Sequence, residues 1–515
     1  MGELRKKVAR GVLWVTLEKF SAQMVHFVVA MVLSRLLTPT DYGTVGLLAI
    51  FLAVAGSLAN CGFGNALVQK KDAGDLEFNT VFYLSLAASG ILYLAFFFAA
   101  PWIARFYDVP VLKPITRIAA LHIVFSAVNS IQGAELSRKM LFHLRFRVTL
   151  FVSIVSAATG IALAFLGYGV WALVWSSFVS GAAGTLAWWT VIAWRPKRMF
   201  SLRAAKGLFS YGWKMSASGL VHTAYSNLYG FLIGRVYTPA DLAYVTKGRS
   251  LPYLAMQMIE GSILNVSFPA LAKLQDRRDK VREAMRRMIQ ASAFLVFPLL
   301  AGLAACARPS LRLLYGGQWE PSTPFVVLAC FTFSLLAVNA VNTMAISAIG
   351  RSDVYLLLEI VKKGTGLAVM LLSIRYGVFA FMLTMGIVMS PFGVFVNMFA
   401  NGRLLGYTPG MQLRDLAPSA LLAAVLYGVA HFACLGVVAL LPASVPPAAS
   451  SAVQLAAAIP AGAGAYIALA LLFRPRPLLD CASMVLPVLR RRAPRFADRI
   501  GHWLQLPNPQ EPDAT

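Results

Sequence analysis

Several ionisable side chains of this sequence lie inside long apolar runs. In the first run, Lys19, Gln23 and His26 stand at positions i, i+4 and i+7, which share one face of a helix. An ionised side chain at the centre of a membrane span costs roughly 2.5–3.5 kcal/mol, so each one needs a physical reason. One reason is binding, because positive charge beside hydrogen-bonding groups can hold an anionic, polar ligand. The alternative is that Lys19 extends its ammonium group to the membrane surface.

A second apolar run, residues 210–234, carries a similar polar stripe. The members of this stripe fall within about 80° of one another on a helix. They are Lys214, Ser218, His222, Tyr225 and Tyr229. The ammonium of Lys214 can also reach the membrane surface, so the same alternative applies to it. If both stripes bind a ligand, we expect them to face one shared cavity.

A third group of charges lies in the apolar run 354–374. Glu359, Lys362 and Lys363 stand at positions i, i+3 and i+4, so the carboxylate can neutralise one lysine on the same helix. One positive charge then remains near the middle of the span. Another carboxylate, Glu260, is either the site of a coupling cation or proton, or a structural partner of one of the lysines.

The residues that usually form metal centres or catalytic sites are scattered. The five cysteines and six histidines show no paired spacing, which argues against a disulfide framework and a zinc site. The sequence also lacks a P-loop, so it predicts no ATP hydrolysis through that motif. We therefore expect no catalytic residue, no metal site and no cofactor.

Charged residues are rare in this sequence, so those inside the apolar runs are unusual. The chain has 515 residues, of which 58% are hydrophobic and only 13% are charged, and its mean hydropathy is +0.69. Soluble domains carry about 25% charged residues, and disordered chains are poor in apolar residues. The composition therefore excludes both classes and indicates a membrane protein with many spans.

Runs of about 20 apolar residues predict fourteen membrane-spanning helices. The predicted spans are 12–35, 43–68, 78–101, 114–134, 147–167, 169–193, 210–234, 250–270, 289–307, 324–348, 354–374, 378–400, 416–440 and 452–473. We also expect residues 273–289 to form an amphipathic helix along the membrane surface, because Val281, Met285 and Met288 recur at helical spacing between charges.

The distribution of basic residues predicts the orientation. With a cytoplasmic N-terminus, 32 of the 46 Lys and Arg residues lie on the inside, 10 lie outside and four lie within spans. This asymmetry predicts that both termini are cytoplasmic. The net charge of +25 then favours attraction to anionic membrane lipids over nucleic-acid binding.

An internal repeat appears at a spacing of 200 residues. Arg35-Leu-Leu-Thr-Pro-Thr-Asp41 recurs as Arg235-Val-Tyr-Thr-Pro-Ala-Asp241. Repeats of this kind are typical of secondary transporters, whose substrate sites lie between the repeats. The predicted domains are therefore an N-lobe (1–200), a C-lobe (201–405), an extra helix pair (406–473) and a basic cytoplasmic tail (474–515).

The two copies of the repeat also predict a gate. A local Arg–Asp pair across each Thr-Pro turn is the simpler interpretation, because exposed pairs are common and contribute little. The alternative is that the pairs exchange partners when the outer side closes, so that Arg35 meets Asp241 and Arg235 meets Asp41.

Five short motifs carry a resemblance to a known family. They are Leu33-Ser-Arg-Leu-Leu-Thr-Pro-Thr-Asp-Tyr-Gly43, Cys61-Gly-Phe-Gly-Asn-Ala66, Ser267-Phe-Pro-Ala-Leu271, Gly316-Gly-Gln-Trp319 and Ala348-Ile-Gly-Arg-Ser352. Their order resembles the polysaccharide transporter (Wzx-type) branch of the multidrug/oligosaccharidyl-lipid/polysaccharide exporter superfamily, and the likeness covers residues 10–405. The second lobe departs from the family pattern at Leu242-Ala243, where a Gly commonly precedes the Tyr.

The resemblance implies a flippase for surface-polysaccharide assembly. Such a protein lies in the cell (inner) membrane and moves polyprenyl-diphosphate-linked oligosaccharide units across it by alternating access between two lobes. The transport is driven by a Na⁺ or H⁺ gradient or by the membrane potential. The implied partners are that lipid, membrane lipids and other polysaccharide-assembly proteins. Two alternatives remain: a cation-coupled multidrug exporter, and a membrane polysaccharide polymerase or ligase.

Overall fold

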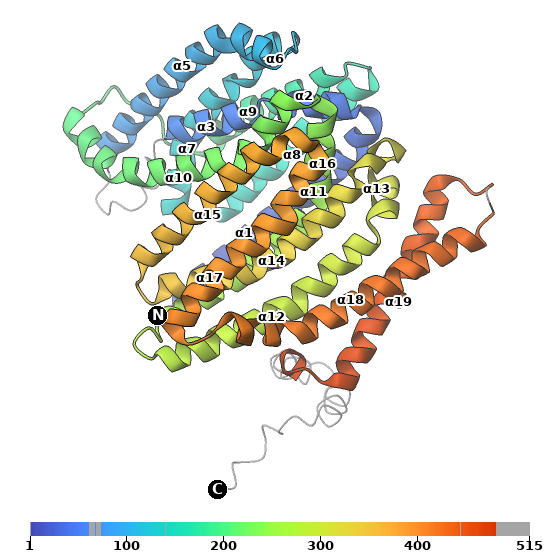
Figure 1. Cartoon of the computed structure of the whole chain (residues 1–515). Coiled ribbons are helices and arrows are strands. Elements are labelled where there is room, and N and C mark those ends of the chain that lie inside the picture. The colour runs from blue at the N-terminus through green and yellow to red at the C-terminus, as the bar shows by residue number, and fades with distance from the viewer. Residues whose placement is uncertain (1, 61–66, 68–73, 140, 443, 480–515) are drawn as a thin grey trace. The chain divides into compact units, whose positions relative to one another are not determined.

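The computed structural model describes residues 2–60, 67, 74–139, 141–442 and 444–479 of the chain (Figure 1). Within these ranges the chain forms helices, and no described residue lies in a β-strand. Eleven of the described helical segments are long and apolar enough to cross a membrane. The predicted fold class, an all-α integral membrane protein, is therefore confirmed. The exact count of fourteen spans stays a prediction.

The helices group into two compact units, residues 1–243 and 244–515. The predicted domain boundaries at residues 200, 405 and 473 stay predictions. The first unit contains α1 (Gly2–Leu36), α2 (Pro39–Gly46), α3 (Ala49–Asn60), α5 (Asp75–Phe106), α6 (Leu112–Ala119), α7 (Leu121–Arg138), α8 (Phe142–Phe165), α9 (Val170–Val191), α10 (Leu202–Val236) and the start of α11 (Pro239–Ala272).

The second unit begins within α11 at residue 244. It continues with α12 (Arg278–Ala305), α13 (Ala307–Tyr315), the 3-10 helix η1 (Gly317–Ser322), α14 (Thr323–Ala348), α15 (Ser352–Ser373), η2 (Ile374–Tyr376), α16 (Val378–Leu383), the π-helix η3 (Thr384–Met389), α17 (Ser390–Leu405), α18 (Pro409–Leu440) and α19 (Pro447–Phe473).

The turn between α17 and α18 follows from its sequence, Gly-Tyr-Thr-Pro. Gly406 ends α17 in the left-handed conformation with a φ of 70°, which glycine adopts without steric cost. The side chain of Thr408 then accepts a hydrogen bond from the backbone N–H of Met411, and Pro409 occupies the first turn of α18. This turn fixes the start of α18, and with it the residues that follow.

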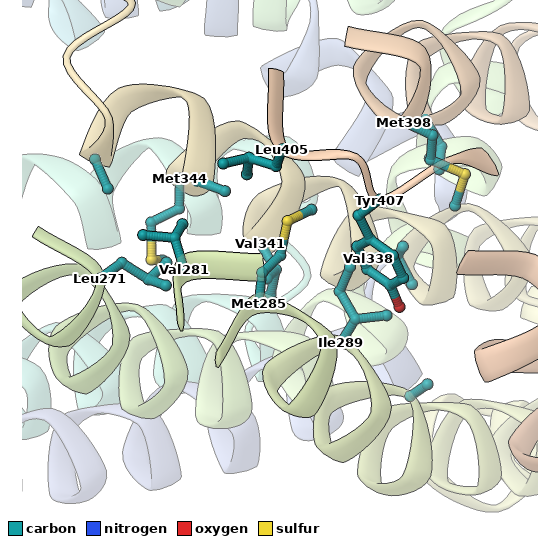
Figure 2. Packing of buried hydrophobic residues seen from close by; sticks show 14 of the residues in the cluster. Leu271, Val281, Met285, Ile289, Val338, Val341, Met344, Met398, Leu405 and Tyr407 are labelled. Carbon is teal, nitrogen blue, oxygen red and sulfur yellow. The ribbon is translucent and has the colours of Figure 1, made fainter. Parts of the chain in front are cut away.

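The core of the second unit is built on the first turns of α12. Val281, Met285 and Ile289 are fully buried and pack with Val338 and Val341 of α14, as Figure 2 shows. The predicted surface helix over residues 273–289 is therefore wrong. Those residues belong largely to the start of α12, and their apolar face lies against neighbouring helices. The charged residues between them suggested a membrane surface, but they occupy the exposed side of the same helix.

Candidate functional site

The two copies of the repeat fold into the same local structure. At the start of α2, the backbone N–H and hydroxyl of Thr38 donate to the carboxylate of Asp41 at 2.9 and 2.7 Å. At the start of α11, Thr238 donates to Asp241 in the same way at 3.1 and 2.7 Å. Both aspartates thus complete capping boxes that satisfy the first backbone donors of a helix.

The two copies also approach each other closely within the first unit. A Cβ atom added to Gly43 would overlap the backbone carbonyl of Pro239 and lie 2.9 Å from its Cα. One turn along α2, a Cβ on Gly46 would lie 3.4 Å from the side chain of Leu242, an ordinary contact. Leu242 is 2% exposed, which explains why the second copy carries a large apolar residue there.

Aromatic rings hold α10 against α5 beside these turns. Phe231 stacks on Phe106 with ring centroids 5.4 Å apart, and it meets Phe51 of α3 edge-on at 6.0 Å. The guanidinium of Arg235 lies 5.2 Å from the centroid of the Phe106 ring. Arg235 of the second copy therefore makes a cation–π contact, which contributes about 0.5–1 kcal/mol at an exposed site. The predicted gate between the copies stays a prediction.

The first polar stripe lies on α1, next to an ion pair that sequence reasoning missed. Lys19 and His26 are exposed, and Gln23 is half-buried. The neighbouring carboxylate of Glu18 is buried and accepts hydrogen bonds from Arg145 Nε at 2.9 Å and Thr149 Oγ1 at 3.1 Å. The sequence signal for this ion pair was the carboxylate of Glu18 inside an apolar run. Its partners lie on α8, more than 120 residues further along the chain.

The second stripe is described in part. His222 is exposed on α10, and Tyr225 and Tyr229 are half-buried. The side chains of Lys214 and Ser218 lie outside the part of the structure that is described. A cavity shared by the α1 and α10 stripes remains a prediction.

The third group is brought together on α15. The carboxylate of Glu359 contacts both lysines, at 2.5 Å from Lys362 Nζ and 3.5 Å from Lys363 Nζ. The single negative charge of Glu359 is shared by two ammonium groups, so this turn of α15 keeps a net positive charge. The Cys61–Ala66 motif lies outside the described residues, and the side chain of Glu260 is not described.

One lysine of α11 is buried among aromatic rings. This residue, Lys247, is 7% exposed. Its Nζ lies 4.1 Å from the centroid of the Tyr315 ring and 5.0 Å from that of Trp319. Aromatic faces stabilise a cation where water is excluded. Trp319 of the Gly-Gly-Gln-Trp motif therefore helps to hold Lys247 in place. The apolar pattern around Lys247 gave no sign of these partners.

The described residues contain no group of three or more His, Cys, Asp or Glu side chains that could hold a metal ion. Cys306, Cys330 and Cys434 are buried free thiols. In the loop before α15, the guanidinium of Arg351 binds Asp353 at 2.9 and 2.8 Å and holds the pKa of that carboxyl at about 2. This exposed pair lies at the end of the Ala-Ile-Gly-Arg-Ser motif.

Comparisons with known proteins agree with this architecture. The chain is 24% identical over 355 residues to the teichuronic acid biosynthesis protein TuaB of Bacillus subtilis (strain 168), covering 68% of this chain and 74% of TuaB. It is 24% identical over 349 residues to the succinoglycan biosynthesis transport protein ExoT of Rhizobium meliloti (strain 1021), covering 68% and 71%. It is 23% identical over 361 residues to the lipopolysaccharide biosynthesis protein WzxC of Escherichia coli (strain K12), covering 68% and 72%.

Two solved structures share the fold. The lipid II flippase MurJ in an inward closed conformation matches with a TM-score of 0.70 at 14% identity, over 90% of this chain and 98% of MurJ. An inward-facing multidrug resistance transporter of the MATE family matches with a TM-score of 0.54 at 12% identity, over 81% and 98%. Residues 32–324, more than half of the sequence, match the family described as Polysaccharide biosynthesis protein, and the chain therefore belongs to that family.

Proposed function

We propose that this protein is a flippase that moves polyprenyl-diphosphate-linked oligosaccharide units across the cytoplasmic membrane by alternating access. The observation that carries the proposal is membership of a polysaccharide biosynthesis family by a chain with eleven described segments able to span a membrane. The name of ExoT adds a transport role among the relatives, and the fold is shared with a lipid II flippase. These findings favour a transporter over an enzyme.

Within this function, the lysines of the spans supply charge to the diphosphate. Lys19, Lys214, Lys362 and Lys363 would take this role, since each lies in a predicted span and a diphosphate needs compensating positive charge in hydrocarbon. Polar and aromatic side chains of the two stripes would contact the sugar units. These are Gln23, His26, His222 and Tyr225. Glu260 and Glu359 would serve as coupling or structural carboxylates.

A binding experiment separates this function from its rivals. Purified protein should be stabilised against heat by a polyprenyl-diphosphate-linked oligosaccharide, because a ligand of the folded state raises the midpoint of unfolding. A cationic dye should give no such shift, whereas a multidrug exporter would show the reverse. Incubation of the same lipid with the protein should leave the glycan length unchanged; elongation would indicate a polymerase or ligase.

The charge of Lys19 provides a first functional prediction. Lys19→Gln keeps a hydrogen-bonding side chain but removes charge, so we expect lipid translocation to fall at least tenfold. Lys19→Arg keeps the charge and should retain part of the activity. Removing both Lys362 and Lys363 should act like Lys19→Gln. The measurement is lipid translocation at equal protein levels. Full activity of both Lys19 variants would indicate that Lys19 only extends its ammonium group to the membrane surface.

The proposed orientation, with both termini in the cytoplasm of the inner membrane, is tested by reporter fusions. Fusions after Val109 and Pro447 should report the outside, and fusions after Lys71 and Arg492 should report the inside. Loss of that alternation would remove the orientation and the two-lobe proposal together.

The proposed gate is tested by exchanging charges between the copies of the repeat. Asp241→Arg should impair transport, and adding Arg35→Asp should restore part of it if the two residues meet when the outer side closes. Because Asp241 also caps α11, the matched control is Asp241→Asn, which keeps an oxygen acceptor for Thr238. Absence of rescue in the double variant would leave both aspartates as helix caps only.

A further inference from the structure

A basic pocket opens in the second unit, and none of the lysines assigned above to the transported lipid lines it. It has a volume of about 780 Å³ and lies where the start of α12, the turn into α18 and the residues that follow α19 come together. The pocket is lined by Asp279, Lys280, Arg282, Glu283, Arg286, Arg287, Gln290, Tyr407, Met411, Arg414, Asp415, Arg476 and Leu479. Its volume is within the range of about 300–1,000 Å³ that is typical of ligand sites.

The floor of the pocket is a fixed, charge-compensated cluster. Arg286 donates to both carboxylate oxygens of Asp415, at 2.7 Å from Nε and 2.6 Å from Nη2. The hydroxyl of Tyr407 donates to the same carboxylate at 2.7 Å. Asp415 and Tyr407 are buried, and the capped turn before α18 holds both in place. The floor is therefore rigid and close to neutral.

The rim of the pocket carries the uncompensated charge. Six basic and three acidic residues line the pocket, which leaves a net charge of about +3. Arg287 pairs with Glu283 at 2.6 Å. Among the residues that the structure describes, the remaining basic side chains have no ion-pair partner, and all are exposed at the rim. They are Lys280, Arg282, Arg414 and Arg476.

The position of the pocket along the helices indicates the source of a ligand. The charged turns of α12 up to Arg287 continue directly into the apolar residues of its span, and the pocket lies at that transition. The charge asymmetry of the sequence predicts that all three lining segments are on the inner side. Phosphate groups of membrane lipids lie at this level, and Met411 and Leu479 add an apolar surface for the glycerol and acyl chains.

We propose that this pocket binds the headgroup of an anionic phospholipid of the bilayer. Guanidinium groups match phosphate oxygens in geometry and charge, and basic pockets between membrane helices on the inner side are suited to such headgroups. Arg282 and Arg414, which approach from two different helices, hold the phosphate, and Lys280 and Arg476 add charge around it. The site is independent of the transported substrate, so it holds whether or not the proposed function does.

The test is direct counting of bound lipid on the full-length protein by native mass spectrometry. Wild type should bind phosphatidylglycerol, and diphosphatidylglycerol more tightly because it carries two phosphates, in preference to phosphatidylcholine. Arg282→Gln with Arg414→Gln should weaken binding of both anionic lipids at least tenfold. Lys273→Gln with Arg277→Gln is the matched control, because it removes the same charge from exposed residues close by that do not line the pocket. That control should bind like wild type.

The charge-keeping variant Arg282→Lys with Arg414→Lys guards against a loss caused by misfolding, and should bind within about threefold of wild type. Equal loss in the pocket variant and its control would overturn the proposal, since binding would then follow overall charge. Displacement of phosphatidylglycerol by inorganic phosphate at equal concentration would assign the pocket to a soluble anion. Displacement by a polyprenyl diphosphate at much lower concentration would assign it to the transported lipid, and either result contradicts a phospholipid site.

Discussion

Gly43→Ala should reduce lipid translocation at least a hundredfold. The added methyl group would overlap the carbonyl of Pro239, and backbone cannot move aside as a flexible side chain can. The start of α2 and the start of α11 would have to separate, and the close approach of the two repeat copies would be lost. Translocation in proteoliposomes, with folded protein quantified by gel filtration, measures the effect.

Gly46→Ala is the control for this prediction, because it makes the same chemical change one turn along α2. Its methyl group would only touch the side chain of Leu242, so transport should stay within about twofold of wild type. Near-normal transport by Gly43→Ala would contradict the view that the contact between α2 and Pro239 is needed for the transport cycle.

Asp415→Ala should have the largest effect on stability. It removes the carboxylate that binds Arg286 and Tyr407 and leaves both donors without their shared acceptor. Breaking a buried ion pair from one side costs several kcal/mol; we expect about 3 kcal/mol here, the low end, because Arg286 is half-exposed. The midpoint of thermal unfolding in detergent should fall clearly, and α18 should lose its fixed start.

Asp353→Ala is the comparison for Asp415→Ala. Asp353 also binds an arginine through both oxygens, but this pair is exposed to solvent, where ion pairs contribute little. Its unfolding midpoint should stay close to that of wild type. A similar, small change in both variants would show that the Arg286–Asp415–Tyr407 cluster does not hold the second unit together.

The membrane fold could be predicted because long apolar runs leave the chain few alternatives. The repeat was also readable, since Thr-Pro-x-Asp marks the start of a helix in both copies, and the structure shows the same capping box at each. The prediction of a surface helix over residues 273–289 was wrong for a physical reason. A helix that packs on a protein core and one that lies on a membrane share the same amphipathic pattern, and only the partners of Val281 and Met285 distinguish them.

Contacts between distant segments could not be predicted from a single sequence. Glu18 and Arg145 are 127 positions apart, and Arg286 and Asp415 are 129 apart, so nothing in local spacing joins them. Lys247 likewise contacts the rings of Tyr315 and Trp319, which lie more than 60 positions further along the chain. For the same reason the basic pocket, assembled from three segments, has no local signature.

The central claim is tested most directly by watching the lipid move. Proteoliposomes containing the purified chain and a polyprenyl-diphosphate-linked oligosaccharide are probed from outside with a glycan-cleaving enzyme that cannot cross the bilayer. We predict that nearly all of the lipid becomes accessible with wild type, and only the outer half with Gly43→Ala or with protein-free vesicles. If half of the lipid stays protected with folded wild type, with and without an ion gradient or membrane potential, the protein is not a flippase for such lipids.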